Sequence, residues 1–206
     1  MIKIEQDKLG LQDYFYIGYL YLIILGIVSD AIFYGIFGVS YLNYTTILDA
    51  LISPISLLIN NWKISLFLGF MFWLMYLYFT KWMFKIYAYL RKKKWYQKMY
   101  NIEKWDKKYE ALGKKKNIIP GMMFIFFLLF ISMRTGMGIG MKYKYANKEI
   151  IPNHTLIFKD NTRLDVRKIG QNSAYFFYFI PGEKVITATP ITDNLKQIKL
   201  LENKKK

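Results

Sequence analysis

Cysteine is missing from the 206-residue chain, and histidine occurs once, at position 154. The absence of cysteine excludes a disulfide framework, a thiolate nucleophile, an iron–sulfur cluster and a cysteine zinc site. A lone His154 excludes sites built from several histidines and is expected to be structural or solvent-facing rather than catalytic. G-x-S-x-G, P-loop, dinucleotide-binding and paired-carboxylate motifs are also missing. We therefore expect no catalytic residues, no metal, no other cofactor and no enzymatic activity.

Basic residues are unevenly distributed along the chain. There are 30 Lys and Arg against 14 Asp and Glu, yet no Lys or Arg occurs between residues 9 and 62. Hydrophobic residues make up 54% of the chain, so charged and apolar residues must be segregated. This pattern is typical of a membrane protein. We predict an α-helical membrane protein with a transmembrane region over residues 1–141.

Three apolar runs predict three transmembrane helices, over about residues 14–36, 64–81 and 118–141. Each run has about twenty residues or more, which cross a hydrocarbon core of roughly 30 Å at 1.5 Å per residue. The first run is too long for the apolar part of a signal peptide, and no small-residue cleavage site follows it. Trp62 and Trp82 flank the second run and are expected to anchor it at the two interfaces.

The segment over residues 44–61 is apolar but differs from the three runs. It contains Asp49 and Pro54, and its uninterrupted apolar stretch is too short to cross a bilayer. We interpret it as an amphipathic segment that lies in the outer interface or dips into the membrane from it.

The basic residues of the short loops predict the orientation. Thirteen Lys and Arg lie between residues 81 and 117, whereas the loop between the first two runs has none before Lys63. Because cytoplasmic loops carry the excess of Lys and Arg, we place residues 82–117 and the N-terminus in the cytoplasm. Residues 142–206 are then extracytoplasmic, and the chain is a multi-pass protein of the inner membrane.

The cytoplasmic loop over residues 82–117 is predicted to be helical, because aromatic and apolar residues recur four apart and Gly113 can end a helix. We expect its lysines to contact anionic lipid headgroups. Contact with a cytoplasmic protein or RNA is the alternative, because basic residues alternate with Trp and Tyr. The expected contact residues are Arg91, Lys92, Lys93, Lys94, Trp95, Lys114, Lys115 and Lys116.

The last 65 residues change character. Short β-branched or aromatic runs, such as HTLIF and AYFFYFI, alternate with turn residues at hairpin spacing. We predict a small antiparallel β-domain over residues 142–206, either a meander or a partly open barrel, with LKQIKLL as a last strand or a short helix. Its apolar content is too low for a large core, so we expect it to lean on the membrane or on neighbouring copies.

Two charges interrupt the apolar runs. Asp30 lies 16 residues beyond Tyr14, and Arg134 lies 16 residues beyond Ile118, in two helices of the same predicted direction. Both therefore lie about 24 Å from the inner boundary. At equal depth they can form an ion pair, within one chain or between two chains, or each can extend separately to the outer headgroups.

Small residues recur every four positions in the third run, at Ser132, Gly136 and Gly140. This spacing places them on one helix face, where a second helix can approach closely. The stripe predicts helix packing, and self-association into a homo-oligomer through the same face.

Two stretches, YGIFGVSYLNYTTILDALISPI and GQNSAYFFYFIPGEKVITATPITDNLKQIKLL, resemble a group of small bacterial multi-pass proteins. Within it, the chain is similar to membrane accessory proteins of antiphage loci, in particular those of type VI-B CRISPR systems. The resemblance implies a membrane accessory or effector in bacterial defence. Such a protein would alter membrane permeability or modulate a cytoplasmic nuclease.

A small channel or transporter subunit, assembled through its extracytoplasmic β-domain, is the alternative function. Under either hypothesis the expected partners are the lipid bilayer, further copies of the chain and a cytoplasmic protein or RNA. No small-molecule substrate is indicated.

Overall fold

The computed structural model describes residues 10–113, 118–146, 151–183 and 185–201. The chain forms two compact units, one of Met1–Ser56 with Ile131–Lys206 and one of Leu57–Phe130.

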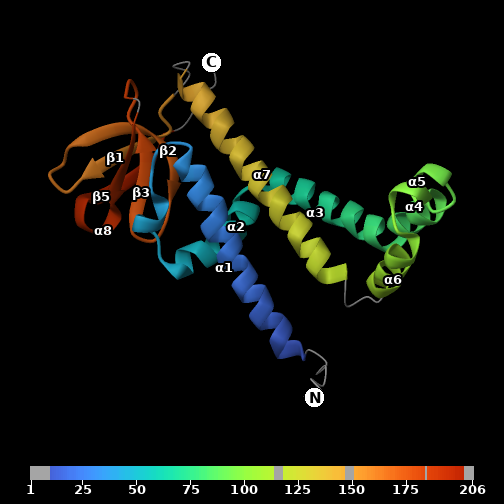
Figure 1. The fold of residues 1–206 in the computed structure, drawn as a ribbon. Helices are drawn as coiled ribbons and strands as arrows, with labels where there is room; N and C mark the ends of the chain where they lie inside the picture. The colour runs from blue at the N-terminus through green and yellow to red at the C-terminus, as the bar shows by residue number, and fades with distance from the viewer. Residues whose placement is uncertain (1–9, 114–117, 147–150, 184, 202–206) are drawn as a thin grey trace. The chain divides into compact units, whose positions relative to one another are not determined.

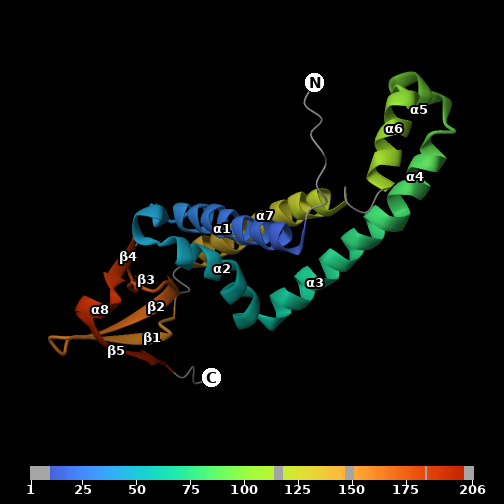
Figure 2. The same cartoon turned by 90° about the horizontal axis from the view of Figure 1, so that it is seen from below.

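The first unit contains helices α1 (Leu11–Gly35) and α2 (Ile47–Asn60, to residue 56), a short 3₁₀ turn between them (Tyr41–Tyr44) and the second half of α7 (Ile118–Ala146). α1 and α7 lie side by side over the C-terminal part of α1 and run in the same direction (Figures 1 and 2). A long apolar run, interrupted within the helix by Asp30, forms most of α1, and a Gly10 N–H that donates to the Asp13 carboxylate at 2.7 Å stabilises its first turn.

Five antiparallel strands complete the first unit in the order β4-β3-β2-β1-β5. β1 to β4 form a meander, and a short helix then brings β5 back beside β1. Asn161 and Gly182, both with positive φ, occupy two of the turns. The antiparallel β-domain is confirmed, and LKQIKLL forms a strand. The elements are β1 (His154–Phe158), β2 (Arg163–Gln171), β3 (Tyr175–Phe179), β4 (Ile186–Pro190), α8 (Ile191–Asn194) and β5 (Leu195–Leu200).

The sheet is apolar on both faces, and alternation along β3 separates them. Phe176 and Tyr178 pack into a core made by the sheet itself. Phe177 and Phe179 pack on the other face against Tyr34 and its neighbours in α1 and the 3₁₀ turn. The sheet therefore rests on helices of its own chain, a contact that its composition alone did not predict.

The second unit is built on one long helical segment. α3 (Trp62–Leu77) continues through a π-helical turn (Tyr78–Trp82) into α4 (Met83–Leu90). Phe79 and Met83 of this segment pack against Ile118 and Met122 at the start of α7. Two short helices, α5 (Lys94–Met99) and α6 (Ile102–Gly113), follow α4, and α6 runs back beside it (Figure 2).

The three predicted apolar runs form three long helices. The stretches that are long and apolar enough to cross a membrane are Leu11–Gly35, Trp62–Leu90 and Ile118–Tyr145. The second continues beyond the predicted end at residue 81, because Lys and aromatic residues end an apolar run without ending a helix. The basic loop is helical but breaks after Leu90 and again at Tyr100, so it comprises α4 and two further short helices, α5 and α6. One compact unit groups the sheet with α1, because the two share a core, and the division at residue 141 stays a prediction.

Candidate functional site

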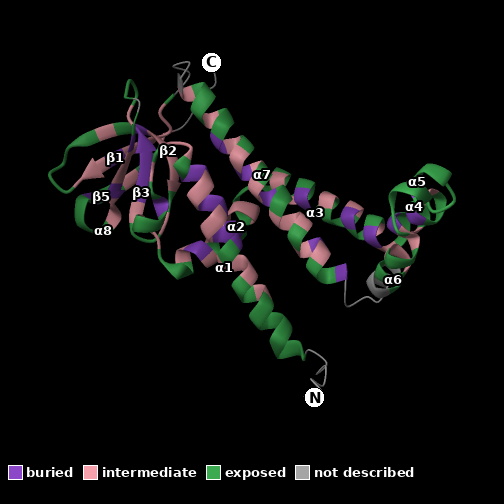
Figure 3. Cartoon of the chain, in the orientation of Figure 1, coloured by how far each residue is buried: buried purple, intermediate pink, exposed green. Residues whose placement is uncertain are grey.

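A buried ion pair joins α1 to α7. Arg134 donates from Nη2 to Oδ1 of Asp30, and the two side chains are 10% and 2% exposed. The structure thus brings together, within one chain, the two charges that the sequence places at equal depth. Both residues are buried and lie in the helical part of the first unit. Figure 3 shows buried segments along α1 and α7 in purple.

The surroundings of the pair are aromatic and closely packed. The Arg134 guanidinium carbon lies 4.1 Å from the ring centroid of Phe33, so the ring face offers a second attraction for the cation. Ser29 is fully buried one residue before Asp30, and its hydroxyl donates to the Gly26 carbonyl at 3.2 Å. In such a site each charge depends on the other, because neither can be hydrated fully.

Lys142 makes a second polar contact between the same helices. Its Nζ donates to the carbonyl of Ile36, the residue that caps the C-terminal end of α1, at 2.7 Å. A cation at this end offsets the partial negative charge of the last carbonyls. The helices lie close at Gly138, where a β-carbon would be 2.6 Å from Cδ1 of the flexible Ile36 side chain and 3.6 Å from the Phe33 carbonyl oxygen. Sequence analysis missed both residues, since neither differs from its neighbours in type or spacing.

α2 approaches α1 at Gly26. A β-carbon at Gly26 would lie 1.8 Å from the Ala50 carbonyl oxygen, so only glycine allows this contact. Pro54 lies four residues after Ala50 in α2 and has no N–H to donate to that carbonyl. The freed carbonyl therefore faces the backbone of α1, where weak Cα–H to oxygen contacts are possible.

Asp49 connects α2 to the sheet. Its carboxylate accepts hydrogen bonds from the backbone and hydroxyl of Thr46, which cap α2, and from the backbone and hydroxyl of Ser173 in the β2–β3 turn. In the same turn Asn172 donates to the Tyr44 carbonyl at 2.6 Å. Burial raises the pKa of Asp49, but the hydrogen bonds from Thr46 and Ser173 outweigh it, so its pKa lies below the ordinary value.

The stripe of small residues on α7 is exposed. Ser132, Gly136 and Gly140 lie on the surface, and a β-carbon at either glycine would meet nothing within 4 Å. Packing of α7 against α1 uses Gly138 instead. Helix packing and self-association through the stripe stay predictions about contacts with another chain.

The predicted contact residues of the basic loop are exposed from Arg91 to Trp95. Arg91 also forms an ion pair with Asp106 of α6 at 3.0 Å, and the Tyr87 hydroxyl donates to the same carboxylate at 2.6 Å. These bonds tie α6 to the end of α4. Lys114, Lys115 and Lys116 lie outside the described residues.

His154 lies at the start of β1, where Nδ1 is 2.9 Å from the side-chain oxygen of Asn153. Burial lowers its pKa, and the neighbouring charges of Lys168 and Arg167 lower it further. Among the described residues no group of three His, Cys, Asp or Glu side chains is placed to hold a metal ion.

No family model, curated protein or solved structure was found to match the chain.

Proposed function

We propose that the chain is an integral membrane protein with three spans, formed by α1, by α3 with α4, and by α7. The observation that carries this proposal is the exposure of the three helices. In the most apolar stretch of each, only 22%, 17% and 22% of the residues are buried. Side chains such as Phe67, Trp73 and Phe124 are more than half exposed. A protein in water rarely exposes so much contiguous apolar surface, whereas lipid covers it.

Because α1 and α7 pack in parallel, the chain that connects them should cross the bilayer an odd number of times. If both helices span the same bilayer in the same direction, the chain must return once in between. The 29 residues of Trp62–Leu90 are long enough for that return, whereas the 14 residues of α2 reach only about 21 Å. This leaves α2 as a segment that does not cross.

The contact at Gly26 favours a dipping position for α2. Asp49 holds the first turn of α2 at the sheet, and Ala50 meets α1 nine residues before that helix ends. Nine residues correspond to about 13 Å along α1. We propose that α2 enters the membrane from the outer side and is covered there by α1.

The charge distribution orients the protein. With thirteen Lys and Arg between residues 81 and 117, we propose that α5 and α6 are cytoplasmic and the sheet extracytoplasmic, in a bacterial inner membrane. The C-terminal segment is also basic, but a folded domain of this length counts little toward orientation.

For biological role we propose a non-enzymatic membrane accessory or effector protein, oligomeric and active in bacterial defence. The resemblance of residues 34–55 and 170–201 to accessory proteins of antiphage loci supports the setting. The ion pair supports a structural role for the two buried charges, because Asp30 and Arg134 neutralise each other. A channel or transporter subunit is the second candidate, favoured by the same pair, since ionisable groups within spans often mark ion pathways.

Cysteine labelling tests the membrane placement, because the chain contains no cysteine of its own. Lys104→Cys and Lys199→Cys introduce single thiols at exposed positions of α6 and β5. The protein should stay in the membrane pellet after alkaline carbonate extraction. An impermeant maleimide added to spheroplasts should label residue 199 and reach residue 104 only after lysis. Extraction by carbonate, or labelling of residue 104 in intact spheroplasts, would contradict the placement.

Ion flux in proteoliposomes separates a channel from an accessory protein that modulates a cytoplasmic nuclease. The modulating accessory predicts no flux above that of protein-free vesicles. Flux that Asp30→Asn changes, and that the exposed control Arg163→Gln does not, would favour the channel instead.

A further inference from the structure

The basic arm, defined as residues 91–108, has an inner side that is held against α4. Tyr96 is buried there, with its ring centroid 6.4 Å from that of Tyr87. Asp106 bonds both Tyr87 and Arg91, so the arm is fixed to the end of α4 by aromatic packing and by a carboxylate. Because the inner side is fixed to α4, the same residues of the arm always face outward.

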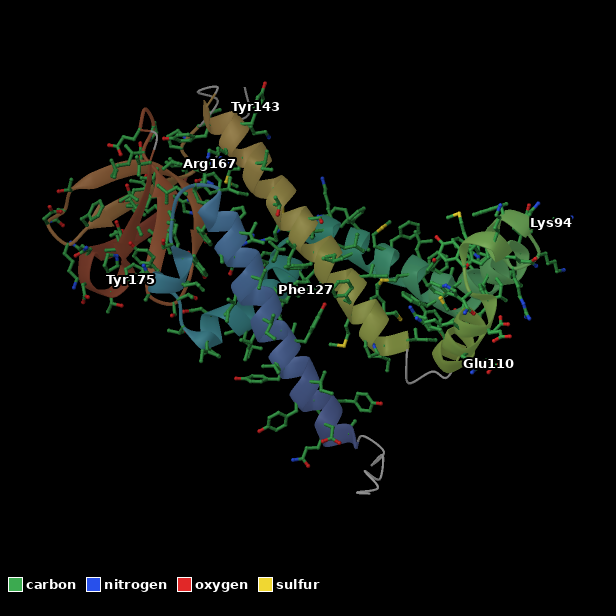
Figure 4. The ribbon with its side chains drawn as sticks, viewed as in Figure 1. Lys94, Glu110, Phe127, Tyr143, Arg167 and Tyr175 are labelled. Atoms are coloured by element: carbon green, nitrogen blue, oxygen red, sulfur yellow. The ribbon has the colours of Figure 1, made fainter. Side chains whose placement is uncertain are left out.

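The outer side of the arm combines apolar and basic residues. Trp95 and Met99, four apart in α5, are 55% and 67% exposed. Lys94 and Lys98, also four apart, lie beside them on the same short helix and are exposed. Figure 4 shows Lys94 extending outward from the end of the arm. An exposed Trp and Met between lysines is the arrangement that an interfacial helix presents to lipid.

The arm carries a large excess of positive charge. Residues 91–108 contain eight Lys and Arg and two acidic residues, Glu103 and Asp106. Asp106 is already paired with Arg91, so it offsets little of the charge on the outer side. Lys93 lies 4.9 Å from the ring centroid of Tyr89, which fixes one cation near the end of α4.

We propose that the basic arm binds anionic phospholipid, with Trp95 and Met99 inserted at the headgroup boundary and Lys94 and Lys98 on the phosphates. The proposal rests on the membrane placement above and adds to it a preference for lipid charge. It makes the arm a sensor of the composition of the inner leaflet.

The position of the arm favours lipid over a soluble partner. Met83 packs against Ile118, where the third proposed span begins, and Arg91 follows eight residues later. Eight helical residues correspond to about 12 Å. A lysine side chain near this point can reach headgroups, which are present at high effective concentration because α4 continues a span.

A spin label at residue 99 tests the proposal. Full-length Met99→Cys is labelled and reconstituted in nanodiscs of phosphatidylcholine, with or without 30% phosphatidylglycerol, and Glu103→Cys is the control on α6. In the anionic discs the label at residue 99 should become accessible to oxygen and protected from a water-soluble nickel reagent. The label at residue 103 should stay accessible to nickel in both kinds of disc.

Charge variants identify the interaction. Lys94→Gln with Lys98→Gln should lower the ratio of inserted to free label roughly 25-fold in anionic discs, since each surface lysine contributes about fivefold. Lys159→Gln with Lys199→Gln removes the same charge from exposed positions of the sheet domain and should change nothing. Unchanged circular dichroism and disc incorporation show that each variant is folded.

Three results would overturn the proposal. They are a label at residue 99 that is equally exposed in both lipids, a lipid dependence that survives the loss of both lysines, and protection that appears only when RNA or an acidic protein is added. Failure to incorporate into discs would instead contradict the membrane placement, so the two failures are distinguishable.

Discussion

At the scale of single residues, glycines and charges decide where the helices of the first unit meet. At Gly26 the Ala50 carbonyl lies close to the backbone of α1, and at Gly138 the side chain of Ile36 lies close to α7. Asp30 and Arg134 then fix the rotation of α1 and α7, because both charges must face the shared interface to be satisfied.

Gly26→Ala should destabilise the protein by about 1–3 kcal/mol, as expected when an atom is forced into a packed contact. The added carbon would overlap the Ala50 carbonyl, which belongs to the backbone and cannot rotate away. Thermal unfolding in mild detergent measures the change. Gly18→Ala is the matched control, because a β-carbon there meets nothing within 4 Å. Equal melting temperatures for the two variants would disprove the close contact.

Asp30→Asn and Arg134→Gln should each lower stability by about 3–5 kcal/mol, the usual effect of breaking a buried pair. The double variant should recover much of the loss, because neither charge is then left alone. A thermodynamic cycle on unfolding in detergent gives the coupling energy. The exposed Arg163→Gln serves as the control for loss of an arginine. Additive effects would show that the pair contributes nothing as a pair.

At the scale of elements, α2 connects the sheet to α1. Its first turn is bonded to the β2–β3 turn through Asp49, and its middle contacts α1 at Gly26. A movement of the sheet relative to α1 must therefore distort α2 or break one of its two contacts.

The Asp49 contact should depend on pH. Because its pKa in the folded protein lies below the ordinary value of 3.8, the contact contributes stability above pH 3.8 and loses it as the pH falls through the folded pKa. Asp49→Ala should therefore melt at a lower temperature than the wild type at pH 7, and the gap should narrow below pH 3.8. Ser173→Ala, which keeps the cap of α2, should show a smaller loss. A gap that does not vary with pH would exclude an ionised Asp49 from the contact.

At the scale of the whole molecule, much of the fold follows from local pattern. Apolar length predicts the three long helices, and β-branched runs between turn residues predict the strands. Asp30 and Arg134 each lie 16 residues after the start of a predicted apolar run, and because helical rise is constant this spacing allows the pair that the structure contains.

The tertiary contacts could not be predicted in this way. Lys142 reaches Ile36 across 106 residues, and Asp49 reaches Ser173 across 124. Such contacts depend on the rotation and register of whole elements, which the type and spacing of nearby residues do not encode. The packing of Phe177 on Tyr34 was missed for the same reason.

Parallel packing of α1 and α7 within one chain is the central claim, because the proposed three-span topology depends on it. Ile36→Cys combined with Gly138→Cys places two thiols at their closest contact, in a chain without other cysteines. Oxidation, or a short bifunctional thiol reagent, applied to native membranes should give a cross-linked monomer. Gly18→Cys with Gly138→Cys, about 27 Å apart along the α1 axis, should not cross-link. Cross-linking of the control pair, or dimers alone from the Ile36 and Gly138 pair, would contradict the claim.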